Sequence, residues 1–224
     1  MFPVIINSTF FHAREENAQM RNQPLKCIVI AALAVAAAAT ISAQELSQAE
    51  KDHALQYLES TRQEVLDATK GLSETQWNFK PGPDRWTCAQ VMEHIAAAED
   101  LIRDGLVKQK IMLSPAGDPG RDAKATDAAV EARVPDRSHK LQAPEPLVPT
   151  NRYGSPEAAL KHFLESRNAT EEYLRSTPGL RDHVADGPTG KMDGYEGILM
   201  IAAHSERHVK QILEVKADPN FPKS

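Results

Sequence analysis

The chain has 224 residues, of which 41% are hydrophobic and 25% are charged, a composition typical of soluble globular proteins. This length allows one domain with a sizeable core and an accessory segment. The formal net charge of −5 gives no electrostatic reason to expect binding to nucleic acid or to an anionic membrane surface.

The N-terminal segment has the pattern of a secretory signal. Arg21 and Lys26 supply positive charge, residues 27–39 form an apolar run, and Ile-Ser-Ala at 41–43 fits a cleavage site. The apolar run is shorter than the ~20 residues that a membrane-spanning helix needs. A cleaved signal peptide is therefore predicted, and an uncleaved anchor is the alternative.

Cleavage after Ala43 would divide the chain into an extension with signal peptide, residues 1–43, and a mature domain, residues 44–224. The expected location is periplasmic or secreted, with no membrane association after cleavage. Cleavage also removes Cys27 and leaves Cys88 alone, so no intrachain disulfide is expected in the mature domain.

Helical periodicity and capping residues predict four long helices in the mature domain. They are expected at about residues 45–70, from the capping box of Thr87 and Gln90, from Ser155 to Pro178, and from Asp193 to near Ala217. No segment has a convincing strand pattern. The predicted fold is an all-α, antiparallel four-helix bundle with a long proline-containing insertion between the second and third helices.

Two histidines of the last expected helix lie on one face. His204 and His208 are four residues apart, in the same register as the apolar residues Ile201 and Ile212. His94 borders the apolar stripe of the second helix. All three imidazoles are therefore predicted to point into the bundle.

Imidazoles converging in an apolar core need partners, because an unpaired buried polar group costs roughly 1–3 kcal/mol. A divalent cation accepts their lone pairs, and three histidines with an open fourth position are typical of a catalytic zinc site. Spacing alone leaves a second interpretation, in which these are ordinary core histidines. The zincin motif is excluded, because Glu206 stands two residues after His204 and therefore points to the opposite side of the helix from that histidine.

The stretches LSETQWNFKPGPDRWTCAQVMEHIAAAED and AAHSERHVKQILEVKADPNFP resemble the DinB-like superfamily of four-helix-bundle proteins. The shared features are a tryptophan before the second helix, a histidine eight residues later, and HxxxH on the last helix. The resemblance extends from about Glu45 to Pro222. It implies that His94, His204 and His208 bind a divalent metal ion, zinc or nickel.

The open coordination position favours a metal-dependent enzyme, in particular a hydrolase acting on an unknown small molecule. The alternative is a non-catalytic, metal-stabilised binding or stress-response module. Some relatives are thiol-dependent transferases, but low-molecular-weight thiols are cytosolic reagents, which makes this activity less expected in an exported protein. Relatives often dimerise, so a homodimer is a further expectation. The sequence assigns no catalytic residue and no organic cofactor.

Four other residues invite functional interpretations. Cys88 opens a helix, where the helix dipole favours a reactive thiolate, although a small buried side chain is the preferred interpretation. His53 is expected to face inward and could approach the histidine site. Glu93 and Glu99 are candidate hydrogen-bond partners around His94. For these three, an ordinary core or surface role is preferred.

The segment 113–154 contains six prolines and few large apolar residues, with a short helix conceivable at 123–133. A connection of this length is uncommon in a compact domain unless it has a function. We expect it to cover one end of the bundle near the three histidines.

Overall fold

The computed structural model describes residues 45–117 and 120–223. The predicted signal peptide, its cleavage site and Cys27 lie outside these residues. Of the helices in the described part of the chain, none combines the length and the apolar character that a membrane crossing requires.

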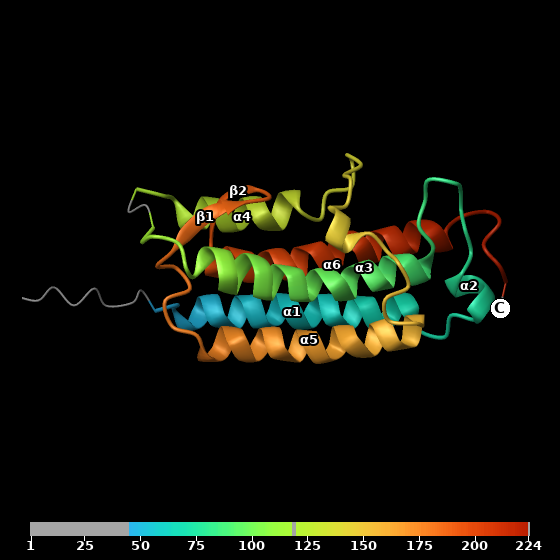
Figure 1. The fold of residues 1–224 in the computed structure, drawn as a ribbon, viewed down its shortest axis with the longest axis horizontal. Coiled ribbons are helices and arrows are strands. Elements are labelled where there is room, and N and C mark those ends of the chain that lie inside the picture. The colour runs from blue at the N-terminus through green and yellow to red at the C-terminus, as the bar shows by residue number, and fades with distance from the viewer. Residues whose placement is uncertain (1–44, 118–119, 224) are drawn as a thin grey trace, which may run out of the picture. The chain divides into compact units, whose positions relative to one another are not determined.

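Four long helical elements pack together, which confirms the predicted all-α four-helix bundle (Figure 1). They are α1 (Gln48–Thr69), α3 (Cys88–Asp100) continued by the π-helical η1 (Leu101–Ile111), α5 (Pro156–Ser176) and α6 (Gly194–Lys216). Buried side chains from each of them fill the core, including Leu58, Ile95, Phe163 and Ile198.

Two pairs of neighbouring helices run parallel. In the pair α1 and α6, Tyr195 donates to the carbonyl of Glu50 near the first turns, and Lys216 donates to the carbonyl of Ala68 near the last turns. The side-chain contacts between α3–η1 and α5 also follow one another in the same order along both helices, so this pair is parallel too (Figure 1). The bundle is therefore antiparallel between these pairs but parallel within them, which differs from the antiparallel bundle that the sequence predicts.

This topology explains the length of the connection between η1 and α5. Because α3–η1 and α5 run in the same direction, the chain must return along the whole bundle before α5 can begin (Figure 1). The returning segment contains α4 (Ala123–Arg133), at the position where a short helix was conceivable, and the 3₁₀ turn η2 (Glu145–Leu147). It passes along the flank of the bundle beside α6, whereas the expectation placed it at one end.

The local helix signals are confirmed. Thr87 and Asp193 each form a reciprocal capping box with the residue three positions later, Gln90 and Glu196. Ser155 caps α5 by accepting from the N–H of Ala158. These caps fix where α3, α5 and α6 begin, and they thereby set which residues of α3 and α6 face each other.

Besides η2, three short elements were not predicted. They are α2 (Glu74–Trp77) and the antiparallel hairpin of β1 (Val184–Gly187) and β2 (Gly190–Asp193). Each strand has four residues, which is too short for an alternating pattern to stand out.

An ion pair lies in the centre of the bundle. Arg167 is fully buried and donates from Nε and Nη2 to the two carboxylate oxygens of Glu99, at 2.8 and 2.9 Å. The same guanidinium also donates to the hydroxyls of Thr61 and Ser205 and to the carbonyl of Leu58. All four long helices thus meet at one arginine.

Candidate metal centre

The three predicted histidines converge between α3 and α6. Nε2 of His94 lies 3.2 Å from Nε2 of His204 and 3.1 Å from Nε2 of His208. Potential donor atoms of all three rings lie within 4.8 Å of one another. Over residues 45–117 and 120–223, no other group of three or more His, Cys, Asp or Glu side chains is close enough to share an ion.

Hydrogen bonds on the far side of two rings fix where their protons lie. Nδ1 of His94 is 2.8 Å from the carbonyl oxygen of Leu147, and Nδ1 of His208 is 2.8 Å from Oε1 of Gln211. An amide oxygen only accepts, so each Nδ1 must carry the proton. In the neutral rings, both Nε2 atoms therefore present lone pairs to each other.

The three rings are neutral at neutral pH. Burial lowers the pKa of His94, and it holds the pKa of His204 and His208 well below the usual value, with neighbouring imidazoles adding to the effect. Two lone pairs facing each other across 3.1 Å repel unless a cation lies between them. The arrangement is thus suited to a positive ion.

The separations also fit a metal ion quantitatively. With metal–nitrogen bonds of about 2.05 Å, nitrogen atoms 3.1–3.2 Å apart subtend angles of about 100° at the metal, near the tetrahedral value. The donor set and its spacing therefore suit a divalent ion of the zinc type.

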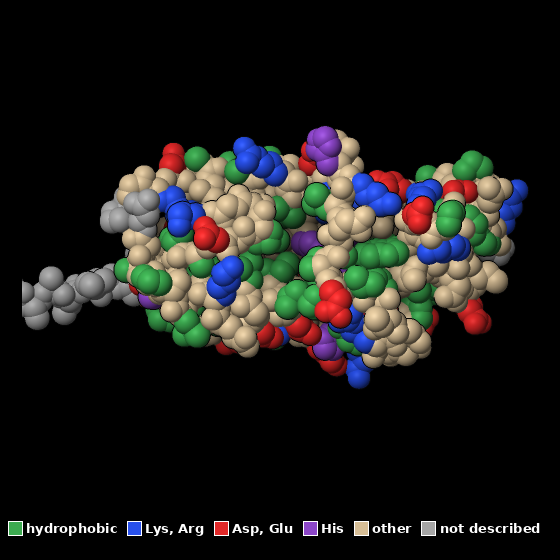
Figure 2. Space-filling model, turned by 45° about the horizontal axis from the view of Figure 1, so that its top comes forward, with side chains coloured by type: hydrophobic (Ala, Val, Ile, Leu, Met, Phe, Trp, Pro, Cys, Tyr) green, Lys and Arg blue, Asp and Glu red, His purple; other side chains and the backbone are tan. Residues whose placement is uncertain are grey.

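The centre opens into a groove of about 1500 Å³ that includes all three histidines in its lining. Figure 2 shows histidine side chains in a hollow with hydrophobic side chains beside it. The ring of Trp86 packs 4.9 Å from that of His94, between ring centroids. Within the described residues no fourth protein ligand joins the cluster, so one coordination position would remain accessible from the groove.

His53 does not approach this centre. Its side chain is 53% exposed, and its Nε2 lies 2.5 Å from a carboxylate oxygen of Glu131 on α4. The expectation that it faces inward is wrong. The buried line of α1 contains Ala54 and Leu58, and His53 lies about 100° away from Ala54 around the helix.

Glu99 does not contact the histidines either, since its carboxylate binds Arg167.

Glu93 supports the position of His94 indirectly, through the backbone of a neighbouring segment. Its carboxylate accepts the backbone N–H groups of Thr150, Asn151 and Arg152, at 2.7–3.2 Å. Burial by itself would raise the pKa of Glu93, but these donors outweigh it and lower the pKa. Glu93 thereby anchors the chain just after the carbonyl that holds His94.

Cys88 is buried and free. Burial raises the pKa of its thiol to about 11, so almost none of it is thiolate at neutral pH. The structure supports the preferred interpretation of Cys88 as a small core side chain.

Leu147 and Gln211 were missed by sequence reasoning. The sequence offered a signal only for Gln211, which stands three residues after His208 and hence on the same face of α6. The contact of His94 with Leu147 joins residues 53 positions apart through a backbone carbonyl, which no side-chain pattern reveals.

Replacing Gln211 with leucine should lower metal affinity by roughly 10- to 100-fold, because His208 would lose the acceptor that fixes its ring and proton. Competition with a chromophoric chelator measures this loss. Gln109→Leu, on an exposed position of η1, is the matched control and should retain full affinity. Equal affinities for the two variants would contradict the orienting role of Gln211.

Known proteins are similar to this chain in sequence and in fold. The chain matches the DinB superfamily over residues 57–212. The uncharacterized protein YuaE of Bacillus subtilis (strain 168) is 24% identical over 160 residues, which cover 69% of this chain and 92% of YuaE.

A solved structure, that of YfiT from Bacillus subtilis, superposes with a TM-score of 0.50 at 18% identity, covering 80% of this chain and 93% of YfiT. YfiT is described as a probable metal-dependent hydrolase with an unusual four-helix bundle topology. At this identity the likeness establishes the shared bundle fold. Since the family match spans more than half of the sequence, the chain belongs to the DinB superfamily.

Proposed function

We propose that the protein is a metal-dependent hydrolase that holds one divalent ion on His94, His204 and His208. The observation that carries the proposal is the convergence of three neutral imidazoles, with Nε2 of His94 lying 3.2 Å from Nε2 of His204 and 3.1 Å from Nε2 of His208. When bound, such an ion supplies Lewis acidity that activates water or polarises a carbonyl or phosphoryl oxygen. The description of YfiT as a probable metal-dependent hydrolase supports the reaction class.

The chain's own residues orient the donors and admit a substrate. Leu147 and Gln211 hold the rings of His94 and His208 in one tautomer. The groove gives a small molecule access to the side of the cluster that no fourth protein ligand occupies within the described residues. This open side favours catalysis over a purely structural metal site, which uses four protein ligands.

The test uses chelator-treated protein reloaded with zinc or nickel, assayed on chromogenic carboxylic ester, amide and phosphoester substrates. Turnover should follow metal content, and His204→Ala should lack it. If the protein binds one equivalent of metal but the loaded form never exceeds the chelated form on any substrate, the non-catalytic module becomes the better account.

The predicted signal peptide leads us to propose that the protein acts in the periplasm or outside the cell. N-terminal sequencing of protein recovered from outside the cytoplasm should begin at Gln44. A recovered chain that retains Cys27 would contradict this location for a cleaved product.

The stability of the metal-free protein should fall on acidification below about pH 6.5. The folded-state pKa values of the three histidines lie below those of the unfolded chain, so the unfolded state takes up protons first. The free energy of unfolding then decreases by up to about 1.4 kcal/mol per pH unit for each histidine. Urea unfolding between pH 5 and 8 measures the slope, and His208→Gln should flatten it. A pH-independent free energy would contradict buried, neutral histidines.

A further inference from the structure

The groove beside the histidines differs in charge from the rest of the molecule. The whole chain carries a formal charge of −5, but the groove lining contains seven Lys or Arg and three Asp or Glu. The basic residues are Lys80, Arg85, Lys110, Arg133, Arg137, Lys140 and Arg207, and the acidic ones are Asp84, Asp186 and Glu214. A positive groove in an acidic protein attracts anions.

Ion pairs already involve two of the three carboxylates, Glu214 and Asp186, and two of the seven basic residues, Arg137 and Arg85, the latter 3.6 Å from Asp218. Glu214 forms a bidentate pair with Arg137, at 2.6 and 2.7 Å, and Asp186 lies 3.7 Å from Lys191, outside the lining. In the part of the chain that the structure describes, Lys110 and Arg133 form no ion pair. Their charges are therefore available to a ligand.

Arg207 adds a further positive charge beside His208. It is 7% exposed, and its guanidinium donates to the backbone carbonyls of Val134, Asp136 and His139. Carbonyl groups satisfy its hydrogen bonds but leave its net charge in place. No ion pair to Arg207 occurs among the described residues, so this charge also contributes to the field of the groove.

The same groove exposes apolar side chains. Leu101, Leu141 and Val148 are 39, 71 and 41% exposed, and all three line it. They are three of the five large hydrophobic residues that the described chain exposes. Concentration of such residues in one concave surface is typical of a ligand-binding site.

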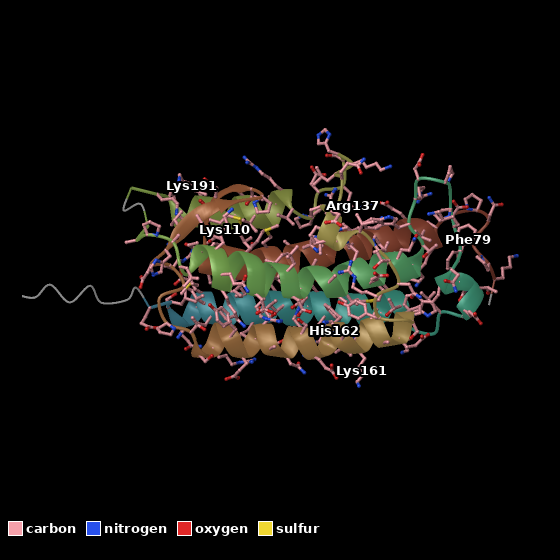
Figure 3. All side chains as sticks on the ribbon, viewed as in Figure 1. Phe79, Lys110, Arg137, Lys161, His162 and Lys191 are labelled. Carbon is pink, nitrogen blue, oxygen red and sulfur yellow. The ribbon has the colours of Figure 1, made fainter. Side chains whose placement is uncertain are left out.

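From this combination we infer that the substrate is an amphipathic anion, a small molecule with an apolar body and a negatively charged group. The inference names the substrate class of the proposed hydrolase and rests on that function. The apolar body would cover Leu101, Leu141 and Val148, while Lys110 and Arg133 attract the negative group. Figure 3 places Lys110 and Arg137 on the side of the bundle that carries α4, and Lys161 on the opposite side.

The test compares three ligands that share an eight-carbon chain and differ in charge: octanoate, 1-octanol and octyltrimethylammonium. Isothermal titration is performed on chelator-treated and on metal-loaded protein. In both forms octanoate should bind about 10-fold or more tighter than octanol, octyltrimethylammonium should bind weakest, and added salt should reduce the preference. The metal-free protein is decisive, because there only the groove can supply the charge selection.

Matched variants test the preference for negative charge and the apolar contact separately. Lys110→Gln combined with Arg133→Gln should remove most of the preference for octanoate, whereas Lys161→Gln, a lysine with a 78% exposed side chain on α5, should not. Leu141→Ser should weaken all three ligands, whereas Leu113→Ser, which is 78% exposed and outside the groove lining, should weaken none.

Equal binding of octanoate and octanol to metal-free wild type would overturn the inference, whatever the protein does with metal. An octanoate preference that responds to the groove variants supports the charge and apolar selection. Failure to bind stoichiometric metal in the same preparation would overturn the hydrolase proposal separately, because the ligand titration does not depend on the ion.

Discussion

Replacing His208 with alanine should abolish stoichiometric metal binding, with affinity falling on the order of 100-fold or more. Loss of a direct ligand should exceed the 10- to 100-fold effects of residues that only support ligands. His208 contributes an Nε2 that lies 3.1 Å from that of His94, and its removal leaves two histidines. Equilibrium dialysis followed by elemental analysis measures the change.

Thermal unfolding gives an independent readout of the same variant. A metal ion at 100 times its Kd stabilises the folded state by about 2.7 kcal/mol, which corresponds to roughly 5–10 °C in Tm for a domain of this size. Wild type should lose this increment on chelation, and His208→Ala should not. His53→Ala is the control, since His53 lies exposed on α1 and away from the cluster. Unchanged metal affinity in His208→Ala would show that His208 is not a ligand.

Replacing Arg167 with methionine should destabilise the protein by about 3–5 kcal/mol, because Glu99 would remain buried without its cation. Both side chains of this pair are almost completely buried. Replacing the partner as well, in Glu99→Leu with Arg167→Met, should recover part of the loss, since an apolar pair carries no uncompensated charge. Urea unfolding of the metal-free protein measures the free energy of unfolding of wild type, of Arg167→Met and of the double variant.

Arg175→Met is the matched control for this effect. Arg175 forms an ion pair with Glu171 one helical turn away, and its side chain is 49% exposed. Exposed pairs contribute about 0–1 kcal/mol. If Arg167→Met costs no more than Arg175→Met, the central ion pair does not hold the four helices together.

The parts of this structure that sequence could predict depend on local signals. Thr87 and Asp193 fix the starts of α3 and α6 through reciprocal hydrogen bonds within one turn. Helical periodicity then placed His204 and His208 on the buried face. The convergence of these two residues with His94 follows from two correctly started helices that pack against each other.

The features that sequence could not predict arise from contacts between distant segments. The parallel pairing of α3–η1 with α5 depends on how the long connection returns along the bundle. The anchoring of Thr150 and its neighbours by Glu93 spans 57 residues, and helical periodicity carries no information about it. His53 was misplaced because an offset of one residue turns a side chain about 100° around a helix.

The most direct test of the three-histidine centre is X-ray absorption at the metal edge of purified wild-type protein, combined with its metal content. The account predicts close to one divalent ion per chain, with three imidazole nitrogens at about 2.0–2.1 Å if the ion is zinc. Substoichiometric metal in protein that has been offered zinc and nickel, or a coordination sphere with fewer than three imidazoles, would contradict it.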